Sequence, residues 1–294
     1  MGVSNSKSIN TPIKLPSQLR IMSYNVEWGF LELPSDINYD ACGHKLPHTK
    51  LAQDSHLNLI AKNIGLCNPD ICFLQEIGSL DAINYIRVSL NNMFGTYYNT
   101  YYSNNEEKGY QGVGILIKEN FKDYYIIKEI PNFPLNRALC VLFDNNGIIY
   151  NFVGLHLKSL CDGKIEKDTK EQLQQLSAVK LFCKDSDYVV ITGDFNNVEN
   201  SEPIKKMIEY NYINLINTNK YIENITCNNE TEFSLHNKNT EEKGSMIDYM
   251  FCSEKIKPLS FNIVNLTREN QSNKKEELRL ETSDHLPILG IFKY

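Results

Sequence analysis

Apolar residues in the first third of the chain recur with two different periods. Residues 19–26 and 69–74 are short, almost continuous apolar runs, which are typical of buried strands. Apolar side chains recur at helical spacing over residues 50–66 and again over 79–90, where Ser79 is a suitable N-cap. The chain therefore opens with a predicted strand, helix, strand and helix.

The middle of the chain changes to β-type periodicity. Short runs rich in Tyr, Ile, Val and Phe fill residues 96–156 and predict consecutive strands of an antiparallel sheet. The later predicted elements are a helix over residues 170–182 and strands over 188–192, 246–252, 258–264 and 286–292. Because no internal repeat or Pro/Ser-rich linker interrupts them, we expect one mixed α/β domain over residues 19–294, preceded by a flexible leader over residues 1–18.

Composition narrows the class of protein. The 294 residues are 41% hydrophobic and 22% charged, which is typical of a globular chain. Thirty Lys and Arg against 36 Asp and Glu give a net charge of −6, which argues against nucleic-acid binding through bulk charge but not against a nuclease with bound cations. The scattered cysteines and the lack of an apolar N-terminal segment predict an intracellular, cytoplasmic protein that is not secreted. We also expect a monomer.

The N-terminus carries one short motif. Gly2 and Ser6 fit the pattern for N-myristoylation, and Lys7 adds a positive charge nearby. An ordinary polar tail that begins Met-Gly is the alternative, and both interpretations stay open at this point. A single acyl chain would give only weak, reversible membrane association.

Candidate catalytic residues share one position, the end of an apolar strand. They are Asn25, Glu27, Glu76, His156, Asp194, Asn196, Asp248, Asp284 and His285. Any one of them alone would be interpreted as the start of a loop or as a core residue, but together they indicate a site at one rim of a sheet. Oxygen donors with few nitrogen and no clustered sulfur donors favour Mg²⁺, with Mn²⁺ as a substitute, and this chemistry suits phosphoester hydrolysis.

The motifs, in order, are S-Y-N-V-E, D-I-C-F-L-Q-E, G-L-H-L-K-S, T-G-D-F-N, I-D-Y and S-D-H-L-P. This set resembles the endonuclease/exonuclease/phosphatase superfamily, also called deoxyribonuclease I-like, over residues 19–294. The resemblance implies a four-layer α/β sandwich in which two packed mixed β-sheets are flanked by helices.

The resemblance also implies a role for each residue. Glu76 would be the central metal ligand, and the remaining candidate ligands are Asn25, Glu27, Asp194, Asn196 and Asp284. Asp194 would orient or deprotonate the attacking water, and Asn196 would hold phosphoryl oxygens. His285 would contact the scissile phosphate while Asp248 fixes its tautomer. His156 matches the first histidine of deoxyribonuclease-like members, and Gln111 is the nearest candidate for its partner.

The substrate class remains open between two enzymes of the same chemistry. The segment over residues 108–117 resembles the corresponding strand of apurinic endonucleases and favours a DNA endonuclease or exonuclease with a nucleic acid substrate. The acidic charge and the Gly2 motif favour a lipid or small-molecule phosphoesterase, such as a sphingomyelinase-like enzyme or a phosphoinositide phosphatase. A scaffold without activity is a third interpretation, against which the intact set of acidic, Asn and His residues argues.

Overall fold

The structure is a computed structural model that describes residues 17–32, 50–103, 111–145, 147–160, 164–218, 246–264, 283 and 285–293. Its helices and strands, in chain order, are β1 (Gln18–Gly29), α1 (Lys50–Cys67), β2 (Ile71–Ile77), α2 (Leu80–Phe94), β3 (Tyr98–Tyr102), β4 (Gly112–Lys118), β5 (Tyr125–Glu129), β6 (Ala138–Asn145), β7 (Ile148–His156), α3 (Ile165–Phe182), β8 (Tyr188–Asp194), α4 (Glu202–Glu209), β9 (Ile213–Asn214), β10 (Asp248–Cys252), β11 (Lys257–Ile263) and β12 (Ile288–Lys293).

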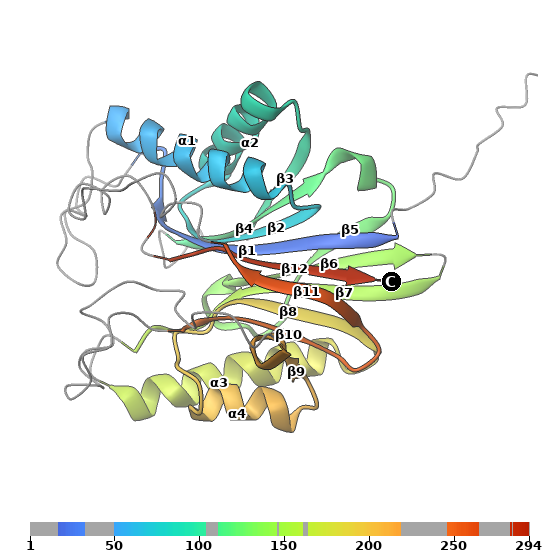
Figure 1. Cartoon of the computed structure of the whole chain (residues 1–294). Coiled ribbons are helices and arrows are strands. Elements are labelled where there is room, and N and C mark those ends of the chain that lie inside the picture. Colours follow the sequence, from blue (N-terminus) through green and yellow to red (C-terminus); the bar gives the residue numbers. More distant parts are fainter. Residues whose placement is uncertain are drawn as a thin grey trace, which may run out of the picture.

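The strands form two six-stranded mixed sheets that pack face to face (Figure 1). The first sheet has the order β11-β12-β1-β2-β4-β3, and the second has the order β5-β6-β7-β8-β10-β9. Helices α1 and α2 cover the outer face of the first sheet, and α3 and α4 cover the outer face of the second. The predicted four-layer α/β sandwich is therefore confirmed.

Strand β2 shows why the central strands read as continuous apolar runs. Its side chains alternate between two cores: Ile71 and Phe73 belong to the core between the sheets, and Cys72 and Leu74 belong to the core beneath α1 and α2. Because both faces of the strand are buried, no polar side chain interrupts the run until the strand reaches its end.

The prediction of one antiparallel sheet over residues 96–156 is wrong. Strands β3 and β4 pair antiparallel in the first sheet, whereas β5, β6 and β7 pair antiparallel in the second. The alternating pattern indicates strands, but it carries no information on which sheet each strand joins. The helix predicted to start at Lys170 begins instead at Ile165, because its first turn is polar and contains the acidic Glu166 and Asp168.

The structure bears on the predictions of reduced cysteines and of a chain without a membrane-spanning segment. The described cysteines are free and buried; they are Cys67, Cys72, Cys140, Cys183 and Cys252. Among the residues that the structure describes, no helix has both the length and the apolar character needed to cross a bilayer. The Gly2 motif lies outside the described residues, and the division into a leader and one catalytic domain stays a prediction.

Candidate functional site

The sheet topology gathers the predicted site residues at one edge of the sandwich. In each sheet a parallel pair, β1 with β2 and β7 with β8, ends at this edge. The antiparallel neighbours β10 and β12 begin at the same edge, and Asp248 at the start of β10 pairs with Asp194 at the end of β8. Ends of parallel strands and beginnings of antiparallel strands therefore meet in space, although they are far apart in the sequence.

Two irregular strand ends give the site its shape. The register of the β1–β2 pair shifts between Asn25 and Gly29, and the register of the β2–β4 pair shifts between Leu74 and Ile77. Glu76 lies inside the second irregularity with a φ of 59°. A non-glycine residue in the left-handed region is unfavourable, and such bulges redirect side chains next to functional sites.

Asn25 joins the two central carboxylates. Its Nδ2 atom donates to Glu76 Oε1 at 3.2 Å and to Asp194 Oδ2 at 3.0 Å. Its Oδ1 atom accepts a hydrogen bond from the backbone N–H of Glu27 at 3.0 Å. The amide group of Asn25, which is fully buried, thus holds a carboxylate from each sheet in a fixed relative position.

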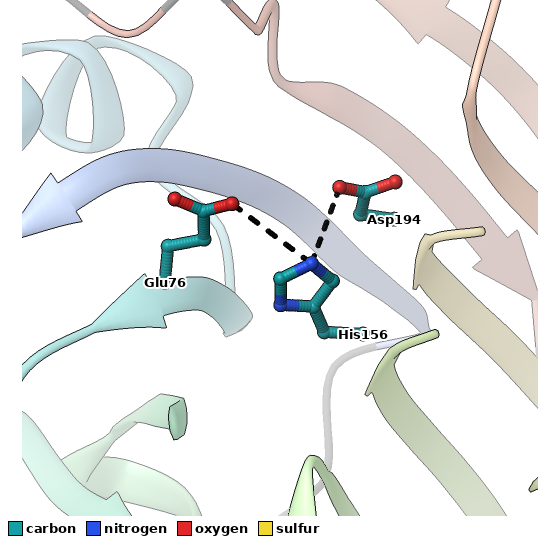
Figure 2. Close-up of side chains that lie close together, drawn as sticks. All are labelled: Glu76, His156 and Asp194. Atoms are coloured by element: carbon teal, nitrogen blue, oxygen red, sulfur yellow. Dashed lines mark ion pairs between the residues drawn. The ribbon is translucent and has the colours of Figure 1, made fainter. Parts of the chain in front are cut away.

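His156 lies between the same two carboxylates, as Figure 2 shows. Its Nε2 atom is 3.9 Å from Glu76 Oε1 and 3.6 Å from Asp194 Oδ2, distances too long for good hydrogen bonds. Burial, followed by the nearby Arg137 guanidinium, lowers the pKa of His156 well below its ordinary value. The His156 ring is therefore neutral at physiological pH.

The expected partner of His156 bonds elsewhere. Gln111 donates from Nε2 to Glu76 Oε2 at 2.9 Å, on the other oxygen of the carboxylate that faces His156. Within the described part of the chain, His156 Nδ1 is buried without a hydrogen-bond partner. Gln111, the candidate partner that the sequence offers for His156, therefore bonds to Glu76 instead.

Asp194 is a buried carboxylate held by several donors. The backbone N–H of Asn196 donates to Asp194 Oδ1 at 2.7 Å, in addition to the bond from Asn25. Burial raises the pKa of Asp194 well above its ordinary value, and Asp248 adds to this shift, whereas His285 opposes it. The Asn196 side chain, from a residue with a φ of 49°, donates to the backbone oxygen of Leu157 at 3.1 Å.

His285 is oriented from both sides. Its Nδ1 atom lies 2.7 Å from Asp248 Oδ2, and its Nε2 atom lies 3.9 Å from Asp194 Oδ2. The Ser283 hydroxyl accepts from the backbone N–H of His285 at 3.0 Å and donates to the backbone oxygen of Asn25 at 2.6 Å. Ser283 therefore ties the segment that carries His285 to the strand that carries Asn25.

Two overlapping groups of side chains have donor atoms suited to a divalent cation. One consists of Glu76, His156 and Asp194, and the other of Asp194, Asp248 and His285; within each group the donor atoms lie within 4.8 Å of one another. Two carboxylates that share a buried site repel each other unless a cation or proton lies nearby, so the donor set of the first group fits a metal. Glu27 belongs to neither of these groups among the described residues, and Asp284 lies outside the described residues.

Arg137 is a site residue that the sequence analysis missed. Its backbone oxygen accepts from the N–H of His156 at 2.9 Å, and its Nε atom is buried without a hydrogen-bond partner among the described residues. Burial lowers the pKa of its guanidinium, and the carboxylates of Glu76 and Asp194 oppose that shift. Arg137 directly precedes β6, which is antiparallel to β7, just as Gln111 precedes β4 next to β2. A polar residue immediately before such a strand is the signal that could have identified it.

Solved structures with the same fold include proteins whose names point to different substrates. The structure of D. rerio TDP2 complexed with single strand DNA product is 19% identical, with a TM-score of 0.60, over 95% of this chain and 100% of that chain. A mannosyl-6-phosphatase from Bacteroides thetaiotaomicron is 17% identical, with a TM-score of 0.62, over 94% of this chain and all of its own. At these identities the likeness shows the fold alone.

Comparison by sequence points to one family. No curated protein matches the chain significantly. The model of the Endonuclease/Exonuclease/phosphatase family matches residues 22–285, which include all of the candidate site residues. The chain therefore belongs to the endonuclease/exonuclease/phosphatase family, whose members are divalent-metal-dependent phosphoester hydrolases.

Proposed function

We propose that this protein is a divalent-metal-dependent phosphodiesterase that cleaves DNA, as an endonuclease or exonuclease. The observation that carries the proposal is the meeting of Asn25, Glu76, Asp194 and the Asp248–His285 pair at one edge of the sandwich. The similarity in fold to TDP2, whose structure holds a single strand DNA product, supports DNA as the substrate class.

Glu76 is the residue best placed to hold the metal, with Asp194 as the second carboxylate of the same group. Asn25 fixes the relative position of both carboxylates, and we retain Glu27, Asn196 and Asp284 as further candidate ligands. A bound Mg²⁺ or Mn²⁺ would neutralise charge on the phosphate and polarise its oxygens.

Asp194 is suited to orient and deprotonate the attacking water. The N–H groups of Asn25 and Asn196 fix the direction of its carboxylate. Because its pKa is raised, Asp194 accepts a proton more readily than an exposed aspartate would. The side-chain amide of Asn196, which donates to the backbone oxygen of Leu157, is our candidate for holding phosphoryl oxygens.

His285 is suited to contact the scissile phosphate through Nε2. Its hydrogen bond from Nδ1 to Asp248 fixes the tautomer and stabilises the imidazolium, so that Nε2 can donate to a phosphate oxygen. Neutral His156 and charged Arg137 add a hydrogen-bonding group and a positive charge near Asp194. Phosphate binding thus uses local charges and does not require a basic surface.

A lipid or small-molecule phosphoesterase is the second candidate. The similarity in fold to the Bacteroides mannosyl-6-phosphatase supports it, because that structure matches this chain as well as TDP2 does. The net charge of −6 also suits a substrate with fewer phosphates than DNA. Membrane association through Gly2 would favour a lipid substrate.

A substrate panel with metal separates the two candidates. Plasmid DNA, an abasic-site duplex, 5′-phosphotyrosyl DNA, sphingomyelin, a phosphoinositide and a sugar phosphate are each incubated with Mg²⁺, with Mn²⁺ and with chelator. We expect metal-dependent cleavage of at least one DNA substrate. Hydrolysis of only a lipid or the sugar phosphate would replace the DNA assignment with the second candidate.

Variants test the site on whichever substrate is cleaved. Asp194→Asn and His285→Asn are expected to lower kcat by about 100-fold or more, as the loss of an acid or base does. Asp187→Asn is the matched control, because Asp187 directly precedes the same strand at its other end and its side chain is 65% exposed. Equal rates for Asp194→Asn and Asp187→Asn would show that the reaction does not use this site.

A further inference from the structure

A buried histidine outside the candidate site contacts the backbone that shapes it. His56 belongs to α1, is 7% exposed, and has its Nε2 atom 2.9 Å from the backbone oxygen of Val26 and 3.1 Å from that of Glu27. Both partners are carbonyl oxygens, which only accept hydrogen bonds. Nε2 of His56 therefore carries a hydrogen and donates it to this pair.

The two carbonyl groups belong to the irregular end of β1. Here the ladder to β2 is interrupted between Asn25 and Gly29, and both Glu27 and Trp28 have positive φ values, 42° and 57°. Each non-glycine residue in this region costs about 1 kcal/mol or more, so the conformation persists only where its surroundings impose it. His56 supplies such a constraint, because it bonds to this segment from the covering helix.

The same segment supplies donors to the candidate metal site. The Asn25 amide bonds to Glu76 and Asp194, and the backbone N–H of Trp28 lies 3.4 Å from Glu76 Oε2. Groups that orient the carboxylates of a metal site change the affinity of the site for the metal, although they do not contact the metal themselves. The segment of residues 25–28 thus connects His56 to Glu76, with hydrogen bonds from His56 to two of its carbonyl groups and from two of its N–H groups to Glu76.

We propose that His56 is a positioning residue that tunes the metal affinity of the site by fixing the segment from Asn25 to Trp28. The inference rests on the proposed function, because it assumes that Glu76 and its neighbours bind the cation. Without the hydrogen bond from His56, the segment relaxes from its left-handed conformation. Asn25 and Trp28 then no longer hold Glu76 in one orientation.

Two substitutions separate the hydrogen bond from packing. His56→Gln keeps an N–H donor at a similar reach, whereas His56→Met keeps a side chain of similar length without a donor. Binding of Mn²⁺ alone, without substrate, is measured by electron paramagnetic resonance of the free ion. We expect His56→Met to raise the Kd for Mn²⁺ by about 10-fold or more, which is the range seen for residues that hydrogen-bond to metal ligands. His56→Gln is expected to keep a Kd close to that of the wild type.

Asn63 provides the matched control. It lies on the same helix, is 6% exposed, and donates from Nδ2 to the Tyr24 hydroxyl of β1 at 3.4 Å. Tyr24 lies on the regular part of the strand, just before the irregular segment, where β1 still pairs in register with β2. Asn63→Ala is expected to lower Tm and to leave the Mn²⁺ Kd unchanged. Equal weakening by Asn63→Ala and His56→Met would mean that any damage to α1 affects the site, which would overturn a specific role for His56.

Glu76→Gln distinguishes failure of this inference from failure of the proposed function. If Glu76→Gln loses Mn²⁺ binding while His56→Met binds as the wild type does, the proposed site stands and the role of His56 is wrong. If Glu76→Gln binds Mn²⁺ as the wild type does, the proposed metal site is wrong, and the inference about His56 is wrong with it.

Discussion

At the scale of single residues, burial sets the charge of the groups at the candidate site. His156 and Asp194 are both buried and lie 3.6 Å apart, and burial is the largest cause of each pKa shift. It lowers the pKa of His156 and raises that of Asp194, because a low dielectric environment favours the neutral form of each group. Both shifts favour the neutral form of the residue, so these two side chains are suited to exchange protons or to bind a cation.

The lowered pKa of His156 predicts how stability depends on pH in the metal-free protein. Between the folded-state pKa and the ordinary value of 6.5, the unfolded chain binds a proton at His156 that the folded chain does not. The free energy of unfolding therefore falls as pH decreases through this window, by at most about 1.4 kcal/mol per pH unit for one group, and it levels off below the folded-state pKa.

Urea denaturation of wild type and His156→Asn with chelator, between pH 5 and pH 7.5, measures this dependence. We expect the variant to lose less stability on acidification than the wild type loses. Asp194 contributes with the opposite sign in its own window, above the ordinary aspartate pKa, and it is present in both proteins. A difference in stability that stays constant with pH would contradict the assignment of a neutral, buried His156.

At the scale of elements, neighbouring residues explain where helix α2 begins and ends, but not the irregular backbone at the ends of β1 and β2. The Ser79 side chain accepts from the backbone N–H of Ala82 at the start of α2, as the sequence predicted. At the other end, Gly95 has a φ of 66° and its N–H donates to the backbone oxygen of Asn91. The bulges at Glu27 and Glu76 have no comparable local signal, since neither residue favours a positive φ.

The N-cap of α2 predicts a stability change without a change in the site. Ser79→Ala removes the side-chain acceptor and is expected to lower the free energy of unfolding by about 1 kcal/mol. Ser79→Asn keeps an acceptor and is the control, with stability close to that of the wild type. Chemical denaturation of the three proteins checks this, and equal stability of Ser79→Ala and wild type would exclude the capping bond as a contributor.

At the scale of the whole molecule, the spacing between the sheets decides whether the site exists. Gly154 on β7 faces Phe73 on β2, and a Cβ atom at Gly154 would lie 2.0 Å from the Phe73 ring. The same two strands carry His156 and Glu76 a few residues further on. Close contact between Gly154 and Phe73 therefore helps to hold the halves of the site at their observed distance.

This contact predicts a coupled effect on stability and activity. Gly154→Ala is expected to lower the free energy of unfolding by about 1–3 kcal/mol, as overpacking does, and to reduce activity because β7 moves away from β2. Phe73→Ala in the same chain removes the two ring atoms nearest to the new Cβ, at 2.0 and 2.4 Å, so the double variant should lose less stability than the sum of the single losses. Thermal unfolding and activity of all four proteins test this, and strictly additive losses would show that the two residues do not interact.

Sequence patterns were enough to predict the type of most elements, the family and the set of polar residues at strand ends. Those features are local: an apolar run, an N-cap such as Ser79, or a short motif such as T-G-D-F-N can be read without knowing the rest of the chain. The start of α3 was missed because its first turn is polar, and the division of residues 96–156 between two sheets was missed because a strand pattern does not specify its pairing partners.

How these residues act together depends on the packing of the two sheets. Asn25 and Asp194 are separated by 169 positions and bond at 3.0 Å because two sheets pack against each other, a relation that no local pattern contains. The same packing brought Arg137 to the site, directed Gln111 to Glu76 and placed His56 behind the irregular strand end. Distances between strands depend on the joint packing of all the side chains between them. The residues of the site could therefore be predicted from the sequence, but the distances between them could not.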